Sequence, residues 1–237
     1  MSWHTKATGG YGYGTTEAKE NAEQIYFILT ARGWGLGAIS GVLGNLQFES
    51  QMNPWRWQSD IVLNSSDPQI DYSTTHGYGL FQFTPAGKYC HSSIARAYPG
   101  FKPNYSNRTG GEFDGYSQVC FVDEHADYIP TAPPYDVPYA SFKLFQLNPR
   151  YCARIWLYNY ERGTADPLRE DYAEIWYNYL SNVTPQPPDN PTGYIGSVPI
   201  GGIVAASRKG GSFSANILKR RLAGRSQARS RWQGKRD

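Results

Sequence analysis

One apolar segment, 36-LGAISGVLGNLQFES-50, constrains the fold more than any other part of the chain. Its large apolar residues are spaced by three, four and three positions: Leu36, Ile39, Leu43 and Leu46. This period predicts a helix, which must end before Asn53-Pro54 because the residue before a proline disfavours helical backbone. The helix also carries three glycines, Gly37, Gly41 and Gly44, each costing about 1 kcal/mol relative to alanine. Glycines on one side of a helix indicate that another backbone packs close against it.

Similar reasoning predicts further helices before and after this segment. An earlier helix has Glu17 and Glu20 near its start and is closed by Gly33. Later helices are expected at 115–128, 138–145, 149–160 and 167–180. Between Trp55 and Gly79 the composition favours loops with a short hairpin, and 77–89 reads as a turn leading into a short apolar element. The predicted fold class is therefore mainly α, with a loop or short-hairpin lobe beside the helices.

The chain divides by composition into four parts. Residues 1–14 form a Gly/Tyr-rich N-terminal arm, 15–182 a domain, 183–207 a Pro/Gly-rich linker and 208–237 a basic tail. The tail has ten Lys/Arg and one acid, a net charge of +9, whereas residues 1–207 carry −6. Such a tail predicts salt-sensitive attraction to an acidic protein or to nucleic acid, the alternative being a solvated terminus without a partner.

Several classes of protein are disfavoured by what the sequence lacks. No run approaches the 18 or so apolar residues of a membrane span, and the N-terminal MSWHTKATGG has no signal-peptide pattern. We therefore expect synthesis in a cytoplasm and no membrane span. The cysteines, Cys90, Cys120 and Cys152, match no zinc-ribbon spacing and are predicted to be buried thiols with at most one disulfide. No metal and no cofactor are expected.

Glu49 is the strongest candidate for chemistry. It lies three residues after Leu46 and seven after Val42, so its side chain continues the apolar stripe. It also falls in the last helical turn, where the helix dipole is negative. Burial and the dipole both disfavour the anion, which predicts a carboxyl that keeps its proton near neutral pH, as a general acid requires.

The residues around Glu49 carry a family resemblance. The string Gly44-Asn45-x-x-x-Glu49-Ser50-x-x-Asn53-Pro54, followed by 77-GYGLFQFTP-85, resembles the phage tail lysozyme family. That family belongs to the lysozyme-like superfamily, with goose-type lysozymes and soluble lytic transglycosylases. The resemblance extends roughly from Ala22 to Leu180, with 159-NYER-162 similar to a late helix-ending signature. It does not cover the linker or the tail.

The resemblance implies cleavage of peptidoglycan between N-acetylmuramic acid and N-acetylglucosamine. Glu49 would be the catalytic acid, Ser50 its companion, and Gln82 a sugar contact on a cleft wall formed by residues 79–82. Aromatic residues could stack on sugars or fill the small lobe: Trp55, Trp57, Tyr78 and Phe81. The implied setting is the tail of a phage particle, from which the enzyme degrades the host wall during DNA delivery. The protein would be made in the host cytoplasm, and other virion proteins would be partners of its basic segment 208–237.

The second carboxylate is left open by the sequence. Asp60, Asp67 and Asp71 all lie in the loop region that should face Glu49, and turn-forming roles are commoner for aspartate. Asp60 is preferred as the catalytic partner because it is nearest to the Trp55-Arg56-Trp57 segment, and Asp71 is kept as a substrate-binding candidate. Glu161, beside Arg162, is interpreted as an ion-paired residue.

Other readings of the sequence remain as alternatives. A transglycosylase or a soluble endolysin would share the fold. A Cys/His peptidase can be drawn from Cys90 and His125, although three cysteines and four histidines give many accidental pairs. Zinc hydrolysis lacks a motif such as HExxH. A non-catalytic tail protein that only grips glycan is the alternative of another class.

Overall fold

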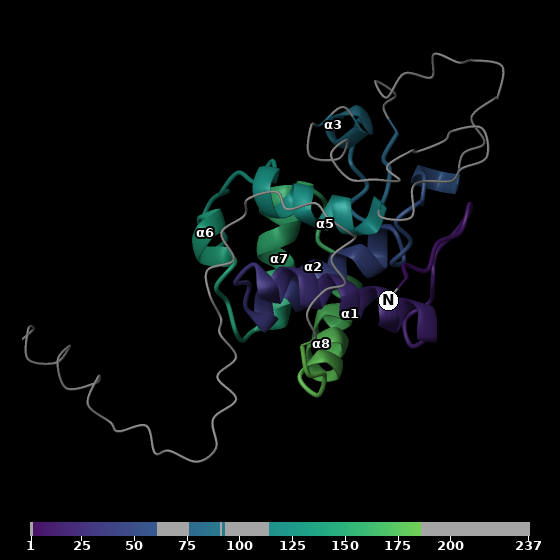
Figure 1. Cartoon of the computed structure of the whole chain (residues 1–237). Helices are drawn as coiled ribbons and strands as arrows, with labels where there is room; N and C mark the ends of the chain where they lie inside the picture. Colours follow the sequence, from purple (N-terminus) through teal and green to yellow (C-terminus); the bar gives the residue numbers. More distant parts are fainter. Residues whose placement is uncertain (1, 61–75, 91, 93–113, 186–237) are drawn as a thin grey trace, which may run out of the picture. The chain divides into compact units, whose positions relative to one another are not determined.

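The protein has a mainly α fold, as the sequence predicts (Figure 1). The computed structural model describes residues 2–60, 76–90, 92 and 114–185. The helices are α1 (Thr16–Ala31), α2 (Leu36–Glu49), α3 (Gly87–Cys90), α5 (Asp114–His125), α6 (Tyr139–Phe142), α7 (Pro149–Trp156) and α8 (Pro167–Leu180). A 3-10 turn, η1 (Gln58–Asp60), and a π-helical turn, η2 (Leu157–Glu161), complete the described elements. None of the described helices is long and apolar enough to cross a membrane.

The helix ends follow local signals in the sequence. The Thr15 side chain caps α1 by accepting a hydrogen bond from the Ala18 amide at 3.2 Å. Asp166 caps α8 through the Leu168 amide at 2.9 Å, and Pro167 occupies the first helical position. The predicted helices at 115–128, 149–160 and 167–180 are confirmed within a few residues, although the helix expected at 149–160 becomes a π turn after Trp156.

The α6 helix is shorter than the predicted 138–145. Its α-helical part ends at Phe142, and the following backbone docks on the start of α2. The carbonyl of Lys143 accepts from the Gly35 amide at 2.7 Å, and that of Phe145 from the Ala38 amide at 3.0 Å. These long-range bonds satisfy groups at the N-terminus of α2, which has no side-chain cap.

The glycines of α2 allow close packing of the surrounding helices, as predicted. α2 packs against α7 and α8, and also contacts α1. A Cβ added at Gly41 would lie 2.6 Å from the carbonyl carbon of Cys152 on α7. One added at Gly44 would clash with the carbonyl oxygen of Arg169 on α8. This close approach brings the first turn of α8 to the last turns of α2.

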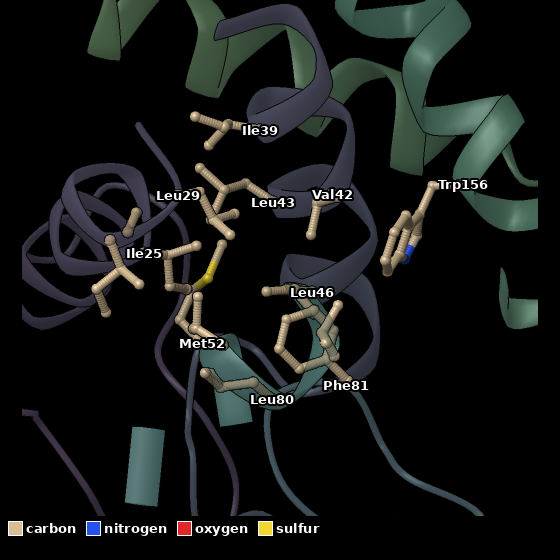
Figure 2. Close-up of a cluster of buried hydrophobic side chains, with 14 of the residues drawn as sticks. Ile25, Leu29, Ile39, Val42, Leu43, Leu46, Met52, Leu80, Phe81 and Trp156 are labelled. Atoms are coloured by element: carbon tan, nitrogen blue, oxygen red, sulfur yellow. The ribbon is translucent and has the colours of Figure 1, made fainter. Parts of the chain in front are cut away.

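The hydrophobic core gathers around α2 (Figure 2). Ile25 and Leu29 of α1 lie on one side and Trp156 of α7 on another, while Leu80 and Phe81 approach from the turn that precedes α3. These side chains are buried, and so are the apolar residues of α2 itself: Ala38, Ile39, Val42, Leu43 and Leu46. The core thus extends from the helices into the start of the small lobe.

The small lobe is represented by short segments. Among the described residues, extended pairing is limited to the isolated bridges Trp57–Tyr78 and Tyr78–Phe83. The second bridge closes a tight hairpin-like turn, with the Phe83 amide donating to the Tyr78 carbonyl at 3.0 Å. The predicted loop region is therefore seen in part, and its portion at 61–75 lies outside the described residues.

Residues 2–14 form an extended arm against the domain. The Gly9 amide donates to Asp60 Oδ1 at 2.6 Å, and the Tyr11 amide to the Gln51 carbonyl at 2.7 Å. Trp3 packs so closely on Gly115 that a Cβ there would clash with its indole ring. Residues Met1–Tyr194 form one compact unit, and residues 195–237, which include the predicted basic tail, lie outside the described residues.

Candidate functional site

A cleft of about 630 Å³ lies beside the C-terminus of α2. Its walls come from separate segments: Glu49, Gln58, residues 81–84, Lys88, Phe121, His125, Asp127 and residues 160–162. This volume lies within the range of small-molecule and cofactor sites in proteins. Two glutamates, Glu49 and Glu161, share the cleft.

Glu49 is the last residue of α2 and forms an ion pair with Arg169 of α8. The Glu49 side chain is 28% exposed, whereas the Arg169 side chain is 7% exposed. The guanidinium carbon of Arg169 also lies 4.1 Å from the centre of the Phe48 ring. No cation is predicted beside Glu49 from the sequence, and charge-assisted hydrogen bonds between a guanidinium and a carboxylate are among the stronger ones in proteins.

Asn45 holds Arg169 in place one turn before Glu49. Its Oδ1 accepts from Arg169 Nη1 at 3.0 Å, and its Nδ2 donates to the carbonyls of Gly41 at 2.9 Å and Ala153 at 3.1 Å. Asn45 is fully buried, so these bonds satisfy an amide that would otherwise be costly to bury. One side chain thereby links α2, α7 and the arginine that contacts Glu49.

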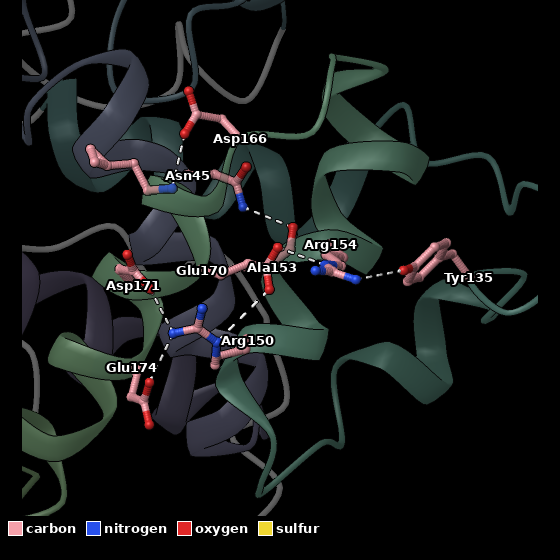
Figure 3. A network of polar contacts seen from close by, with 10 residues as sticks. Asn45, Tyr135, Arg150, Ala153, Arg154, Asp166, Glu170, Asp171 and Glu174 are labelled. Atoms are coloured by element: carbon pink, nitrogen blue, oxygen red, sulfur yellow. Dashed lines mark hydrogen bonds and ion pairs between the residues drawn. The ribbon is translucent and has the colours of Figure 1, made fainter.

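Ion pairs on the outer side of the same helices tie α7 to α8 (Figure 3). Arg154 Nε donates to Glu170 Oε1 at 2.6 Å, and Glu170 is the residue that follows Arg169 in the sequence. Arg150 Nη1 lies 2.7 Å from Asp171 and 2.9 Å from Glu174. The two pairs of Arg150 are exposed and contribute little free energy individually, whereas Glu170 is buried. Together these contacts hold α7 against the start of α8, where Arg169 lies.

Glu161 occupies a different electrostatic environment from Glu49. It ends the π turn η2, is partly buried, and accepts a hydrogen bond from Trp156 Nε1 at 3.1 Å. Burial, and secondly the negative charge of Glu49, raise the pKa of Glu161 to about 8, against the opposing effects of Arg169 and the indole. The interpretation of Glu161 as ion-paired with Arg162 is wrong. Arg162 Nη2 instead lies 3.2 Å from Asp127 Oδ1.

The π turn that carries Glu161 is held by a buried asparagine, Asn159. Its Oδ1 accepts from the Thr131 amide at 2.9 Å and the Thr131 hydroxyl at 2.8 Å. Its Nδ2 donates to the Tyr135 carbonyl at 2.7 Å and the Tyr128 hydroxyl at 2.9 Å. π turns are rare and frequently occur at functional sites. Here the wider turn carries Tyr160 and Glu161 to the cleft.

Phe81 and Gln82 lie at the cleft, where the sequence placed a binding wall. Gln82 has a left-handed φ of 45°, and its Nε2 donates to the carbonyls of Arg56 at 3.0 Å and Gly79 at 2.9 Å. Phe81 is almost fully buried and meets the Tyr160 ring edge to face at 6.3 Å. Both residues remain proposed substrate contacts.

Two predicted binding residues do not line the cleft. Ser50 is fully buried, and its hydroxyl donates to the Leu46 carbonyl at 3.0 Å. Tyr78 is also fully buried, with its hydroxyl bonded to Asp114 and its ring 4.5 Å from that of Trp57. The structure therefore places both in the supporting core, because their polar atoms bond inward.

The preferred second carboxylate, Asp60, also does not line the cleft. Its Oδ1 accepts from the Gly9 amide at 2.6 Å, and its Oδ2 lies 3.8 Å from Arg56 Nη2. These contacts anchor the N-terminal arm. Asp67 and Asp71 lie outside the described residues. Among the described carboxyl groups, Glu161 and Asp127, and not Asp60, therefore share the cleft with Glu49.

The rival chemistries gain no support from the described residues. Cys90 is 1% exposed, although a nucleophilic cysteine needs an accessible thiolate. Cys120 and Cys152 are buried thiols as well, and burial raises the pKa of Cys152 to about 12. Within the described ranges, no group of His, Cys, Asp and Glu is arranged to hold a metal ion.

A mainly helical domain with a glutamate at a helix end on its cleft is the arrangement expected of a lysozyme-like protein. The sequence model of the phage tail lysozyme family matches residues 20–180, and the chain belongs to that family. Morphogenesis protein 1 of Bacillus phage B103 is 30% identical over 172 residues, which cover 70% of this chain. The matched part is 40% of that protein, so the chain spans about two-fifths of its relative's length.

Proposed function

We propose that the protein hydrolyses the β-1,4 bond between N-acetylmuramic acid and N-acetylglucosamine in peptidoglycan. The observation that carries this proposal is the pair of glutamates, Glu49 and Glu161, on one cleft in unlike electrostatic surroundings. Glycoside hydrolysis commonly needs one protonated carboxyl to protonate the leaving oxygen and one carboxylate to stabilise the positive sugar ring. Burial raises the pKa of one of the two, Glu161, so the pair offers carboxyl groups in different surroundings for these two tasks.

The surrounding cleft suits a sugar substrate. Phe81 and Tyr160 supply apolar ring surface, and Gln58 and Gln82 supply amide groups able to hydrogen bond hydroxyl or acetamido groups. Lys88, His125 and Arg162 add positive or titratable groups on the same cleft. These could meet the carboxylates of the muramic acid lactyl group or of the stem peptide.

The proposed setting is the phage particle, where the enzyme would open the wall locally during genome delivery. Membership of a phage tail lysozyme family supports this setting, as does similarity to a phage protein named for morphogenesis. A soluble endolysin with the same fold is the nearest alternative. Immunodetection separates the two: the protein should be found in purified phage particles if it is part of the virion, and only in lysates if it is an endolysin.

The first prediction tests the reaction itself. Glu49→Gln keeps the side-chain shape but removes the charge and any transferable proton, so glycan cleavage should fall about 100-fold or more while the fold survives. Release of soluble glycan from purified walls measures the rate, and circular dichroism checks the fold. Asp60→Asn is the matched control and should cleave nearly as well as the wild type, because Asp60 does not line the cleft.

The products and the wild-type result decide between related functions. Hydrolysis yields a reducing muramic acid end that borohydride reduces, whereas a transglycosylase yields a 1,6-anhydro end, and mass spectrometry distinguishes them. Binding to walls without any cleavage by the wild type would contradict the enzyme and favour a glycan-binding tail protein.

A further inference from the structure

We propose that residues 4–11 of the N-terminal arm position the carboxyl group of Glu49 for the reaction, by fixing the turn that follows it, residues 50–53. This inference rests on the proposed function, in which Glu49 takes part in cleavage. The segment lies before residues 20–180, the part of the chain that matches the family. Among the described residues that line the cleft, none belongs to this segment. Any contribution of the arm to cleavage must therefore act through the residues that it contacts.

The turn after Glu49 has an unfavourable backbone conformation. α2 ends at Glu49, and Gln51 and Met52 follow with left-handed φ angles of 50° and 60°. Residues other than glycine rarely adopt such angles, and they persist only where the surrounding structure holds them. Helix ends also fray, so the position of Glu49 depends on how firmly the chain beyond it is held.

Tyr11 joins the arm to the chain on both sides of Glu49. Its carbonyl accepts a hydrogen bond from Gln47 Nε2 at 3.0 Å, and its amide donates to the Gln51 carbonyl at 2.7 Å. Gln47 and Gln51 each lie two positions from Glu49 in the sequence. Because Gln47 is buried, its bond to the arm satisfies an amide nitrogen that is costly to leave unpaired. One arm residue thus bridges the last turn of α2 and the strained turn after it.

Gly10 lies directly against the same turn. A Cβ added there would lie 2.2 Å from Gln51 Cβ and 2.5 Å from the Ser50 carbonyl oxygen. These distances are too short for non-bonded atoms, and the second contact is with backbone, so a side chain at Gly10 must push the arm and the turn apart. At Gly12 the nearest atom to an added Cβ would be Thr15 Cγ2 at 4.0 Å, an ordinary contact.

Asn53 binds the arm at the other end of the turn. Its Nδ2 donates to the carbonyls of Lys6 at 2.8 Å and Gly9 at 2.7 Å, and the residue is fully buried. The Gly9 amide donates to Asp60 Oδ1, an acceptor that an asparagine at position 60 would retain. The arm therefore follows the turn from Gln51 to Asn53.

Asn21 of α1 completes the contact. It is fully buried, and its Nδ2 donates to the carbonyls of His4 and Met52, both at 2.8 Å, while its Oδ1 accepts from the His4 amide at 2.9 Å. The carbonyls of the two left-handed residues are thus both bonded: that of Gln51 by the arm, and that of Met52 by an asparagine that the arm also binds. The strained turn keeps its shape through these contacts.

Steady-state kinetics of the full chain on soluble, uncrosslinked peptidoglycan strands test the proposal. We expect Gly10→Ala to lower kcat about 10- to 100-fold, because small displacements of a catalytic group are costly. KM should stay within about twofold of the wild type, since the arm does not line the cleft. Gln47→Met keeps the side-chain length but removes the donor to Tyr11, and should lower kcat about two- to tenfold, as expected for one hydrogen bond.

Matched controls separate positioning from general stability. Gln24 of α1 also donates to an arm carbonyl, that of Ser2 at 2.9 Å, so Gln24→Met removes the same kind of bond at the start of the arm. Gly12→Ala is the control for Gly10→Ala. Both controls should keep the wild-type kcat and KM. Circular dichroism at the assay temperature checks that each variant is folded, because a purely structural role would lower only the folded fraction.

Hydrogen exchange shows whether the arm has moved. Mass spectrometry of Gly10→Ala should find faster amide exchange than in the wild type in peptides that cover residues 2–14 and 50–55, because the bond between Tyr11 and Gln51 is broken. Peptides from α7 and α8 should exchange as in the wild type. Faster exchange in the arm together with a wild-type kcat would overturn the positioning role.

The remaining outcomes also decide the matter. Wild-type kcat in both Gly10→Ala and Gln47→Met would overturn the proposal, and so would an equal loss of kcat in Gln47→Met and Gln24→Met. If Gly10→Ala does not fold, Gln47→Met and its control give the answer alone. All of these results leave the proposed function standing, whereas absence of any cleavage by the wild type would overturn the proposed function and the role of the arm together.

Discussion

At the residue scale, neighbouring groups rather than residue type distinguish the two glutamates of the cleft. Glu49 meets the guanidinium of Arg169, whereas Glu161 meets an indole and the charge of Glu49. A third acid, Asp114, is fully buried away from the cleft, where Tyr78 and Tyr89 donate hydrogen bonds to it. Burial raises the pKa of Asp114 to about 6 despite those bonds. The raised pKa values of Glu161 and Asp114 make the free energy of unfolding depend on pH.

The second prediction concerns that dependence. Glu161 has a pKa of about 8 in the folded protein against the ordinary 4.5, so the folded state binds more protons between these values. The free energy of unfolding should therefore fall as pH rises from about 5 to 8, by at most about 1.4 kcal/mol per pH unit for this group. Urea unfolding at several pH values measures the slope.

Glu161→Gln separates Glu161 from Asp114 in that experiment. Asp114 lowers the free energy of unfolding mainly as pH rises from about 4 to 6, because its pKa in the folded protein is about 6. The variant should therefore lose the slope between pH 6 and 8 and keep the slope below pH 6. Parallel curves for variant and wild type from pH 6 to 8 would show that Glu161 ionises as it does in the unfolded chain.

At the scale of elements, the site depends on how closely α8 approaches α2. Gly44 leaves room for the carbonyl of Arg169, and Asn45 binds its guanidinium. The π turn after α7 carries Glu161, the second glutamate of the cleft. Asn159 holds this turn against the segment around Thr131 and Tyr135. Two packing contacts thus bring together carboxyl groups that are 112 positions apart in sequence.

The third prediction tests that approach with Gly44→Ala. Helix propensity alone would stabilise this variant by about 1 kcal/mol, so any loss must come from packing. We expect a net destabilisation of about 1–3 kcal/mol, because the new methyl group clashes with backbone that cannot rotate away. Cleavage should fall as well, since α8 and Arg169 must shift from Glu49.

Chemical unfolding and the wall-cleavage assay measure both effects. Gly12→Ala is the matched control, because the nearest atom to its added Cβ would be Thr15 Cγ2 at 4.0 Å. It should leave stability and cleavage nearly unchanged. A Gly44→Ala protein that is more stable than the wild type would show that the helices have room to separate.

At the scale of the whole molecule, the contacts of the site lie within the family match at 20–180. The unit Met1–Tyr194 contains the arm and all described helices. The strong positive charge of the chain is concentrated in residues 208–237, after the Pro/Gly-rich segment. Catalysis and attachment to a partner are therefore expected to be separable.

The fourth prediction follows from this separation. A chain of residues 1–186 should unfold cooperatively and cleave purified walls at a rate close to that of the full chain. Binding of the full chain to an acidic partner or to nucleic acid should weaken as salt rises, and the shortened chain should lose it. Calorimetry and the wall assay give the result, and non-cooperative unfolding of the shortened chain would show that the removed residues belong to the fold.

The sequence by itself determined the helices and the close packing on α2, and it singled out Glu49, which lines the cleft. These depend on local patterns: apolar spacing, capping residues, glycines on one helix side and a short motif string. It could not choose between Asp60, Asp67 and Asp71, because a turn aspartate and a catalytic aspartate look alike in one sequence. It also placed Ser50 and Tyr78 at the substrate, although their polar atoms bond inward.

Only the tertiary structure decided which charges meet Glu49. Arg169 follows it by 120 positions and Glu161 by 112, and no periodic pattern connects residues so far apart. Their meeting depends on the approach of α8 at Gly44 and on the π turn at Asn159. The protonation of a carboxyl group is set by burial and by charges a few ångströms away, and those distances exist only once the helices have packed.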